Sequence, residues 1–338
     1  MNKLLWMNQL LEQRDHPLPI LTFPAAKRLG ISVRDLIKDP EKQAMTMAEV
    51  ARVWPMGAVL SMMDLSVEAE AFGAPIRYFD DDIPTVIGAI VHDSVDAENL
   101  AVPTVSGHRT ETYVEGIRRA KDRIPNRPLI AGVIGPFSLS GRLMDMTEIM
   151  VDCYMEPERV HRVLEKATAF ITDYIHAFKA AGADGVLLAE PAAGLLSPAL
   201  CEEFSSRYIR TIAESVKDDD FAFFYHNCGN TLPLLDSLAG IGADAYHFGD
   251  AVSMKEVLAR FSPRVPVMGN LSPSEVFRKG TPETVRAVTL SLLRENFHHR
   301  NWVLSSGCDI PPKAPLENVE AFFETVRAFY SHEGSWVK

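Results

Sequence analysis

The sequence predicts an α/β protein, a single-domain (β/α)8 TIM barrel, from three observations. Eight short apolar segments recur along the 338 residues with helical patterns between them. Polar residues able to bind metals or substrates fall at the C-terminal ends of most of these segments. No linker or low-complexity segment divides the chain, so one domain over residues 1–338 is the simplest organisation. The barrel is preferred to a doubly wound sheet because its C-terminal strand ends meet at one mouth, where active sites lie.

Each predicted strand is a short apolar run bounded by Gly, Pro or polar residues. In chain order the strands are Leu18–Phe23, Ala58–Asp64, Leu129–Gly135, Asp184–Glu190, Phe221–Asn227, Asp244–Asp250, Val265–Asn270 and Trp302–Cys308. Apolar residues at helical spacing predict amphipathic helices over Met155–Ala181, Pro198–Val216, Ser253–Phe261, Pro282–Phe297 and Leu316–Tyr330. Two helix-to-strand junctions share the sequence Gly-Ala-Asp, with glycine at the helix end.

Two regions fall outside this alternation. Residues 1–17, MNKLLWMNQLLEQRDHP, carry a short interrupted apolar patch, which predicts an N-terminal amphipathic helix and not a signal peptide. A region of about residues 75–109 contains Pro84, Pro103 and the acidic run Asp80–Asp82. We expect it to be an insertion after the second strand that folds over the barrel mouth. The acidic run is interpreted as a solvated turn in preference to a metal site.

Charge and cysteine content limit the classes of partner. The net charge is -11 and the sequence pI is about 5.4, which argues against nucleic acid or an anionic membrane as the main partner. The chain has four cysteines, which is sparse for its length and indicates a reducing compartment. No apolar run approaches the ~20 residues that span a bilayer. We therefore expect a cytoplasmic protein.

The stretch FAFFYHNCGN places His226 and Cys228 at the end of a buried strand. Residues two apart in a strand project to the same side, so their side chains are expected to lie together. Cys308 ends another strand, in NWVLSSGCDIPP. An imidazole and two thiolates are three of the four ligands that zinc takes in a tetrahedral site. The alternative is that the two cysteines are ordinary buried residues.

Six further segments carry a family resemblance. They are MMDLSVEAEAFGAPI, GPFSLSGRL, GADGVLLAEPAAGLLSP, YHNCGN, VMGNLSP and SSGCDIPPKAPLENV. In this order the chain resembles the uroporphyrinogen decarboxylase superfamily, and within it the cobalamin-dependent methyltransferases typified by methylcobamide:coenzyme M methyltransferase. The resemblance covers most of the chain and implies a (β/α)8 barrel with a single deep mouth.

Two positions separate the branches of this superfamily. Its decarboxylases carry an arginine-rich segment of the type RQAGR after the first strand, whereas this chain has LTFPAAKRLGIS, with Lys27 and Arg28 nearby but without the paired arginines. The decarboxylases also have a histidine after the last strand, where this chain has Cys308. The zinc methyltransferases have His-x-Cys and a late cysteine. The resemblance therefore favours the methyltransferase branch.

What the resemblance implies is a zinc-dependent transfer of a methyl group from methylcobalamin, carried on a separate corrinoid protein, to a thiol such as coenzyme M. Zn²⁺ deprotonates and activates the acceptor thiol. The alternatives are a uroporphyrinogen decarboxylase, which makes coproporphyrinogen, and a non-catalytic relative that keeps the barrel as a binding module. The identity of the thiol and the corrinoid partner are left open by the sequence.

His226, Cys228 and Cys308 are the expected metal ligands and catalytic residues. Asp250, which ends the next strand, and Glu190, which points into the mouth, are two candidates for the fourth zinc position. Glu190 has two further candidate roles, as a contact that supports His226 or as a group that binds the thiol substrate.

Three more polar residues have competing interpretations. Asp64 matches the decarboxylases' substrate-binding aspartate, with a structural hydrogen bond as the alternative. Asn270 is expected to line the pocket or to cap the following helix, with Ser272 as the better cap. His247 lies in mid-strand and is interpreted as a hydrogen-bonded core histidine.

Overall fold

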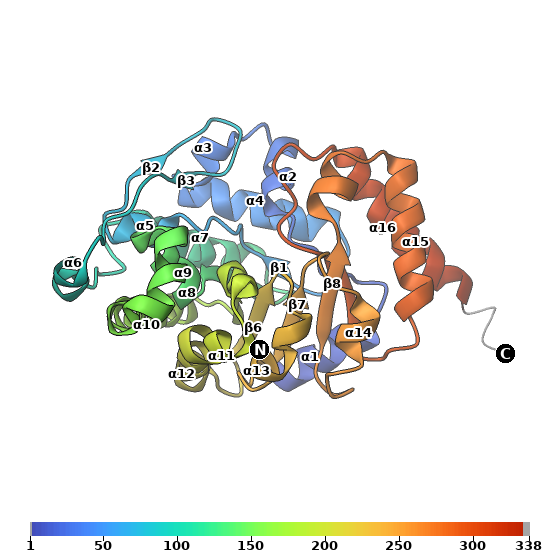
Figure 1. Cartoon of the computed structure of the whole chain (residues 1–338). Coiled ribbons are helices and arrows are strands. Elements are labelled where there is room, and N and C mark those ends of the chain that lie inside the picture. The colour runs from blue at the N-terminus through green and yellow to red at the C-terminus, as the bar shows by residue number, and fades with distance from the viewer. Residues whose placement is uncertain (1, 334–338) are drawn as a thin grey trace.

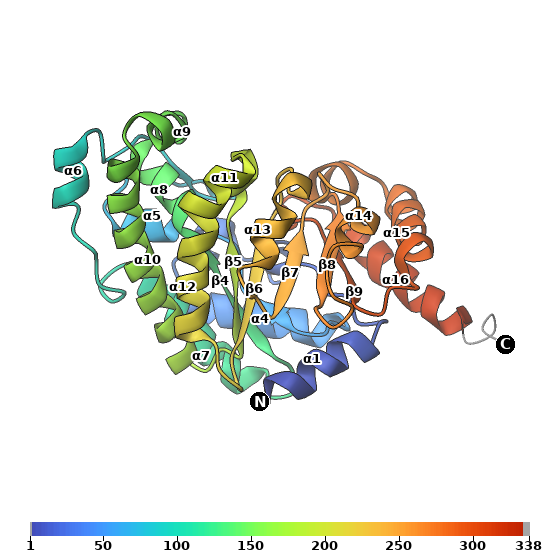
Figure 2. The ribbon, with the colours of Figure 1, turned by 60° about the horizontal axis from the view of Figure 1, so that its bottom comes forward.

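The computed structural model describes residues 2–333 and has a curled parallel sheet surrounded by helices (Figures 1 and 2). Seven strands lie in the spatial order β1-β4-β5-β6-β7-β8-β9, and each pairs in parallel with the next. Each of the seven overlaps a predicted strand. Their bounds are β1 Val59–Leu60, β4 Leu129–Ile134, β5 Gly185–Ala189, β6 Ala222–Asn227, β7 Ala245–Phe248, β8 Val267–Leu271 and β9 Trp302–Ser306.

The first predicted strand, Leu18–Phe23, is not a strand of the sheet, so the prediction of eight strands is wrong in this detail. The Leu18 amide makes one sheet-like bond, to the carbonyl of Leu304 in β9 at 2.9 Å. The chain already turns into a helix at Thr22, whose hydroxyl donates to the carbonyl of Leu60 in β1 at 2.6 Å. An extended segment therefore lies between β9 and β1 without a regular backbone ladder.

Serine hydroxyls replace backbone groups at this seam. Ser306 Oγ accepts the amide of Ile20 at 3.0 Å, and Ser305 Oγ donates to the carbonyl of Leu18 at 2.7 Å. Both serines belong to β9. Because side chains supply these partners, the buried backbone groups are satisfied although the segment does not pair as a strand.

Helices cover the outside of the sheet. The α-helices of the described residues are α1 Lys3–Glu12, α2 Thr22–Arg28, α3 Val33–Leu36, α4 Pro40–Val53, α5 Val67–Ala71, α6 Ser94–Asn99, α7 Arg109–Arg123, α8 Pro136–Met144, α9 Met146–Met155, α10 Pro157–Ala180, α11 Pro198–Cys201, α12 Arg207–Val216, α13 Leu235–Ala239, α14 Met254–Leu258, α15 Pro282–Asn296 and α16 Leu316–Glu333. Short 3-10 turns cover Pro191–Leu195 and Leu232–Leu234, and π turns cover Glu202–Ser206 and Pro273–Arg278. The helices predicted from apolar spacing, including the N-terminal one, are confirmed with small shifts of their ends, except that the one predicted over Pro198–Val216 is divided into α11 and α12 by a π turn.

The region of residues 75–109 contains an antiparallel pair of two-residue strands, β2 Ile76–Arg77 and β3 Thr85–Val86, followed by α6. The amides of Ile90 and Val91 both donate to the carbonyl of Leu143, at 2.8 and 3.0 Å, so this region packs against the end of α8. Because α8 follows directly from the C-terminal end of β4, the region lies on the side of the sheet where the strands end.

The acidic run at residues 80–82 is held by surface ion pairs. Asp80 pairs with Arg34 at 2.6 Å, and Asp82 pairs with Lys313 at 3.1 Å. Asp80 is 79% exposed, and Asp82 is about half exposed. These contacts agree with the interpretation of this run as a solvated turn.

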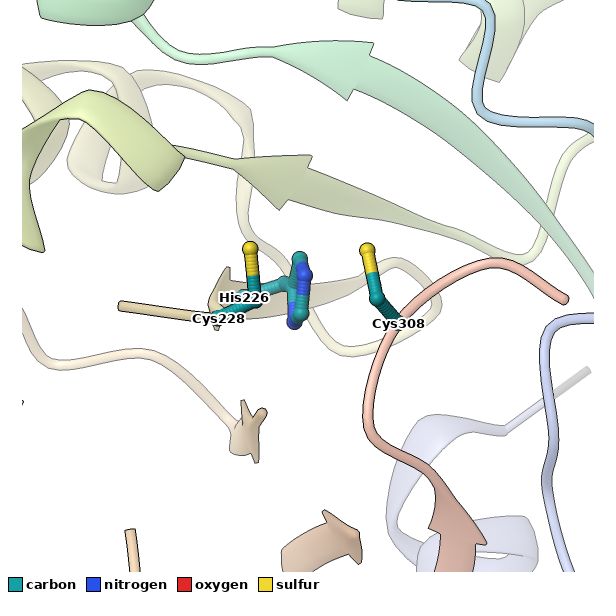
Figure 3. Close-up of side chains that lie close together, drawn as sticks. All are labelled: His226, Cys228 and Cys308. Atoms are coloured by element: carbon teal, nitrogen blue, oxygen red, sulfur yellow. The ribbon is translucent and has the colours of Figure 1, made fainter. Parts of the chain in front are cut away.

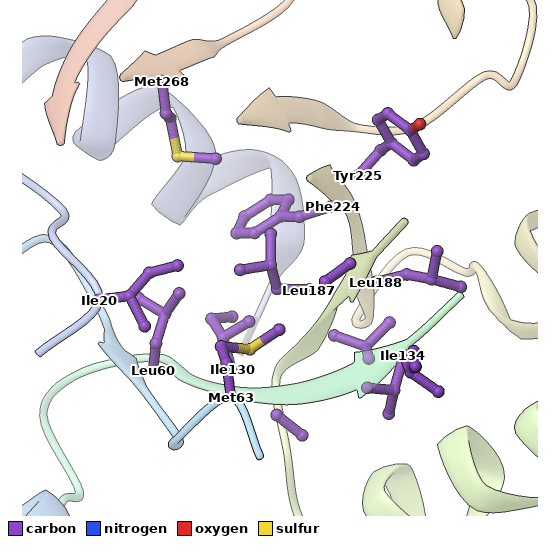
Figure 4. Packing of buried hydrophobic residues seen from close by; sticks show 14 of the residues in the cluster. Ile20, Leu60, Met63, Ile130, Ile134, Leu187, Leu188, Phe224, Tyr225 and Met268 are labelled. Carbon is purple, nitrogen blue, oxygen red and sulfur yellow. The ribbon is translucent and has the colours of Figure 1, made fainter. Parts of the chain in front are cut away.

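Apolar side chains from facing strands fill the interior of the sheet. Figure 4 shows Ile20, Leu60, Leu187 and Phe224 converging from different sides, and each is at most 4% exposed. Ile20 takes its place in this core although its segment is not a strand. None of the helices within residues 2–333 combines the length and the apolarity needed to span a membrane.

Candidate metal centre

His226, Cys228 and Cys308 meet at the C-terminal end of the sheet. His226 is the penultimate residue of β6, Cys228 follows directly after that strand, and Cys308 lies two residues beyond the end of β9. One ligand atom from each residue lies within 4.8 Å of the other two. Figure 3 shows the imidazole between the two thiols, with both sulfur atoms on the same side. The sequence prediction that these three side chains come together is therefore matched by the geometry.

Close backbone approach at the strand ends requires glycine. A Cβ atom on Gly249 would lie 2.5 Å from the Cα of Cys228, and a Cβ on Gly307 would lie 2.8 Å from the backbone nitrogen of Asp250. Any larger residue at either place would push neighbouring strand ends apart. These two glycines therefore allow Cys228 and Cys308 to face each other.

Asn227, which lies between His226 and Cys228, organises the turn that presents Cys228. Its amide nitrogen donates to the carbonyl of Glu190 at 2.7 Å, and its amide oxygen accepts the backbone amide of Gly229 at 2.8 Å. Asn227 is fully buried, so these bonds tie the end of β6 to the end of β5.

One nitrogen of His226 is bonded and the other is not. Nδ1 lies 2.7 Å from Nδ1 of His247 and 3.2 Å from the carbonyl oxygen of His247. Nε2 is buried and has no hydrogen-bond partner among the described residues. A buried polar atom without a partner is costly, so each such atom calls for an explanation. A metal ion bound at Nε2 provides one.

The two thiols have opposite acidities. A hydrogen bond from the Cys308 thiol, together with the neighbouring imidazole of His226, lowers the pKa of Cys228 to about 4. The same contact, together with burial, raises the pKa of Cys308 well above its usual range. In the metal-free protein one thiol of the pair therefore ionises readily and the other holds its proton.

The donor set fits zinc. Two cysteine sulfurs and one imidazole nitrogen are typical zinc ligands, and three protein ligands leave a tetrahedral ion one position for a substrate or water. The easily ionised Cys228 is close to the thiolate state that a metal requires.

Asp250 does not join this group. It lies beyond the end of β7 and is exposed, and its carboxylate is not among the atoms that lie within 4.8 Å of one another. Its backbone nitrogen faces Gly307, so the residue is near the centre without being part of it. Its role as a fourth ligand stays a prediction.

Glu190 is fully buried, and its carboxylate contacts a helix. Its two carboxylate oxygens accept the backbone amides of Phe137 at 3.0 Å and Ser138 at 2.6 Å, in the first turn of α8. A carboxylate there satisfies amides that the helix leaves unpaired. Burial raises the pKa of Glu190 to about 7. The expected contact with His226 is not made by this carboxylate; the backbone amide of Glu190 bonds to the His226 carbonyl instead.

Asp64 is engaged in a buried ion pair. Its carboxylate pairs with Arg109 and accepts the hydroxyl of Tyr113 at 2.7 Å and the hydroxyl of Ser66 at 2.6 Å. Arg109 in turn contacts Glu70 at 2.5 Å. Of the two interpretations of Asp64, the structural hydrogen bond is the one that these contacts support.

Asn270 braces a loop. Its amide donates to the carbonyls of Gly249 and Val252, at 2.8 and 2.7 Å, which fixes the chain after β7. Ser272 accepts the amide of Glu275 at 3.2 Å and caps the helical turn that follows, as predicted.

Sequence reasoning missed two features near the centre. His247 was correctly interpreted as a buried core histidine, but its contacts with His226 and Ser305 were not foreseen. The carboxylate of Asp309, next to Cys308, accepts the Met63 amide through Oδ2 at 3.0 Å, and its buried Oδ1 has no partner in the described part of the chain. Burial raises the pKa of Asp309 to about 8. Its position directly after Cys308 was the one indication available.

A curled parallel sheet whose polar residues gather at the C-terminal strand ends is the architecture of TIM-barrel-like enzymes. The family model described as Uroporphyrinogen decarboxylase (URO-D) matches residues 19–329. The chain belongs to the uroporphyrinogen decarboxylase family.

Relatives from both branches of the family match most of the chain. A uroporphyrinogen decarboxylase from Neisseria meningitidis is 27% identical over 340 residues, covering 95% of this chain and 91% of the relative. The methylcobamide:CoM methyltransferase MtbA from Methanosarcina acetivorans is 27% identical over 296 residues, and the match covers 86% of this chain and 85% of MtbA. Because the identities are equal, these relatives do not decide between the two reactions.

A solved structure described as a methyltransferase from Methanosarcina mazei superposes with a TM-score of 0.84 at 24% identity, and the match covers 96% of this chain and 97% of that one. A B12-independent methionine synthase from Shewanella gives a TM-score of 0.57 at 16% identity, covering 86% and 88%. At these identities the likeness shows a shared TIM-barrel-like fold.

Proposed function

We propose that this chain is a zinc-dependent methyltransferase that moves a methyl group from a methylated corrinoid protein to a small thiol. The observation that carries the proposal is the meeting of His226, Cys228 and Cys308 within 4.8 Å, with His226 Nε2 buried and without a hydrogen-bond partner among residues 2–333. A site made of these donors is suited to a thiophilic metal that keeps one position for an exchangeable ligand.

The three side chains would hold the ion, and each is placed by a different local device. His226 is carried by a buried strand, Cys228 by the turn that Asn227 organises, and Cys308 by the loop that begins at Gly307. When bound, zinc supplies the Lewis acidity that keeps an acceptor thiol ionised at neutral pH. The site at the strand ends presents that thiol at the face where barrel enzymes receive their substrates.

The proposed reaction balances without a further oxidant or reductant. A lone pair on the acceptor sulfur forms the new carbon–sulfur bond, and the carbon–cobalt bond of methylcobalamin breaks. The bonding electrons stay on cobalt as cob(I)alamin, and the proton of the acceptor thiol is released to solvent. Holding the two reactants in line is the part of the barrier that a rigid mouth can lower.

The contacts of Arg28 and Asp64 argue against the decarboxylase alternative. Arg28, near the place where decarboxylases carry paired arginines, bonds to Glu49 and Glu320 at 3.2 and 3.3 Å. Asp64, which would have to bind the substrate's pyrrole nitrogens, already pairs with Arg109 and Tyr113. These contacts leave neither group free for a tetrapyrrole. A binding module without catalysis would have no need of three metal-ligand side chains that converge at the strand ends.

Zinc content and a methyl-transfer assay test the proposal. Purified protein supplied with zinc is expected to hold about one ion per chain, as structural and catalytic zinc sites do. Zinc-loaded protein mixed with methylcobalamin and a panel of thiols, coenzyme M included, is expected to produce the cob(I)alamin absorption spectrum and the methyl thioether together. Cys153→Ala, which removes a buried cysteine of α9 outside the cluster, is the control.

Conversion of uroporphyrinogen to coproporphyrinogen by the same preparation, without methyl transfer, would replace this proposal by the decarboxylase. A protein that binds no zinc and transfers no methyl group would remove it.

A further inference from the structure

A line of four groups runs from the metal centre to the seam of the barrel. His226 Nδ1 lies 2.7 Å from His247 Nδ1, and His247 Nε2 lies 2.8 Å from Ser305 Oγ. The Ser305 hydroxyl donates to the carbonyl of Leu18 at 2.7 Å. His226 and His247 are direct neighbours in the parallel pairing of β6 and β7, so their rings project to the same side of the sheet.

The position of each hydrogen along this line follows from the Leu18 carbonyl at one end, because a carbonyl oxygen only accepts hydrogen bonds. Ser305 has one hydroxyl hydrogen, and the carbonyl of Leu18 receives it. Ser305 Oγ therefore accepts from His247, and the proton of His247 sits on Nε2. Its Nδ1 then carries a lone pair and accepts from His226, because two nitrogens 2.7 Å apart share one hydrogen.

The other contact of His226 agrees with this direction. Its Nδ1 also faces the backbone carbonyl oxygen of His247 at 3.2 Å, and a carbonyl oxygen accepts hydrogen bonds only. A bare nitrogen in this place would face two acceptors. The hydrogen of His226 is thus on Nδ1, and Nε2, for which the described residues offer no hydrogen-bond partner, is left with its lone pair.

We propose that His247 and Ser305 are positioning residues that hold His226 in the Nδ1–H tautomer, so that Nε2 is permanently ready to bind the metal. This inference rests on the proposed metal centre and deepens it. Without the line of hydrogen bonds, the proton of His226 would be free to move to Nε2, which would remove the lone pair and would also let the ring turn. Groups that fix a ligand histidine in this way typically change metal affinity 10- to 100-fold when removed, and we expect a loss of roughly this size.

Zinc affinity, measured by competition with a chromophoric chelator, tests the role of His247. His247→Phe keeps a ring of similar size but offers no acceptor, and it is expected to weaken zinc binding by roughly 10- to 100-fold. His247→Asn provides an amide oxygen in place of Nδ1 and is expected to bind zinc more tightly than His247→Phe. His176→Phe, on the exposed face of α10, is the control for loss of a histidine and should leave the affinity unchanged.

A second pair of variants tests the far end of the line. Ser305→Ala removes the hydroxyl that accepts the His247 proton, although the Ser306 backbone that also contacts this ring remains, and is expected to weaken zinc binding. Ser306→Ala removes the neighbouring buried hydroxyl, which serves Ile20 and not His247, and should leave the affinity unchanged. The melting temperature of each metal-free variant separates a loss of folding from a loss of affinity.

The tautomers can be observed directly in the unmutated protein. Long-range proton–nitrogen correlation spectra of zinc-loaded, ¹⁵N-histidine-labelled protein are expected to show His226 protonated at Nδ1 and His247 protonated at Nε2. Spectra of the His247 variants assign the signals.

The outcomes separate the two proposals. If the unmutated protein binds no zinc, the metal centre itself is wrong. If it binds zinc but His247→Phe binds equally tightly, or if His247 carries its proton on Nδ1, the metal centre stands and the positioning role of His247 and Ser305 is wrong.

Discussion

The carboxylate of Glu190 accepts the backbone amide of Ser138 at 2.6 Å, and so a residue at the end of β5 holds the first turn of α8. A Cβ atom on Gly135, which precedes this helix, would come within 2.4 Å of that carboxylate. The two elements therefore pack closely against each other at the C-terminal end of the sheet. This relationship gives Glu190 a structural role that can be separated from catalysis.

Glu190→Gln is expected to lower the free energy of unfolding by about 1–3 kcal/mol at pH 5, because an amide group cannot accept both backbone hydrogens as a carboxyl group does. Since the folded-state pKa of about 7 lies above the usual 4.5, the folded protein binds this proton more tightly. The stability that comes from this tighter proton binding is therefore fully present below pH 4.5, and it is lost as the pH rises towards the folded-state pKa of about 7.

Glutamine does not titrate, so the difference in the free energy of unfolding between the unmutated protein and Glu190→Gln should become smaller from pH 5 to pH 8. Denaturant unfolding at both values checks this, with Glu214→Gln on the exposed side of α12 as the control for a lost carboxylate. A deficit that grows with pH would contradict the buried, protonated carboxyl.

In the metal-free protein, Cys228 is expected to be alkylated by iodoacetamide well before the other cysteines at pH 6. Its pKa of about 4 makes it largely thiolate at that pH, whereas burial raises the pKa of Cys153 to about 12 and that of Cys201 to about 11. Mass spectrometry of peptides after short labelling times measures the order. Added zinc should protect Cys228, and equal labelling of all four cysteines would count against this view of the pair.

Removing Cys308 should have two effects on its partner. Cys308→Ala deletes the hydrogen bond that contributes most to the low pKa of Cys228, so that pKa should rise and alkylation at pH 6 should slow. The same variant loses one of the three proposed zinc ligands and is expected to purify without stoichiometric zinc. The pH dependence of the alkylation rate measures the change in the pKa of Cys228, and metal analysis of the purified variant measures the loss of zinc. Retention of zinc would exclude Cys308 from the centre.

Breaking the Asp64–Arg109 pair should cost stability. Arg109→Met leaves the buried carboxylate of Asp64 without its cation, a change expected to lower the free energy of unfolding by about 3–5 kcal/mol. Adding Asp64→Asn removes the stranded charge, so the double variant should be less destabilised than the sum of the two single variants. Additive losses would show that the two side chains do not interact.

The parts of this protein that follow from local pattern were predictable. Strand ends carrying His226, Cys228 and Cys308 can be recognised because an apolar run stops at a polar residue, and parallel strands bring such ends together. The interpretation of the Leu18–Phe23 segment as a strand failed because serine hydroxyls of β9, almost 290 residues further along the chain, replace two of the backbone groups that a regular ladder would need.

Glu190 shows why polar roles are harder to predict than positions. Its location at the mouth was foreseen, but its partners are the backbone amides of Phe137 and Ser138, more than 50 residues upstream, and no side-chain pattern marks them. His247 was recognised as a core residue from its mid-strand place. The direction of its hydrogen bonds depends on Ser305 and Leu18, whose proximity only the folded chain creates.

Ser305 connects the N-terminal segment to β9 and also contacts the proposed metal centre through His247. The Ser305 hydroxyl of β9 donates a hydrogen bond to the carbonyl of Leu18 in the N-terminal segment. The same oxygen accepts a hydrogen bond from His247, which contacts His226. The contact between the N-terminal segment and β9 and the proposed metal-binding strength of His226 are thus linked through a single oxygen atom. With the proposed ion at His226, loosening the N-terminal segment would weaken metal binding, and a chain whose first segment has not yet docked on β9 would hold the ion less firmly than the completed fold.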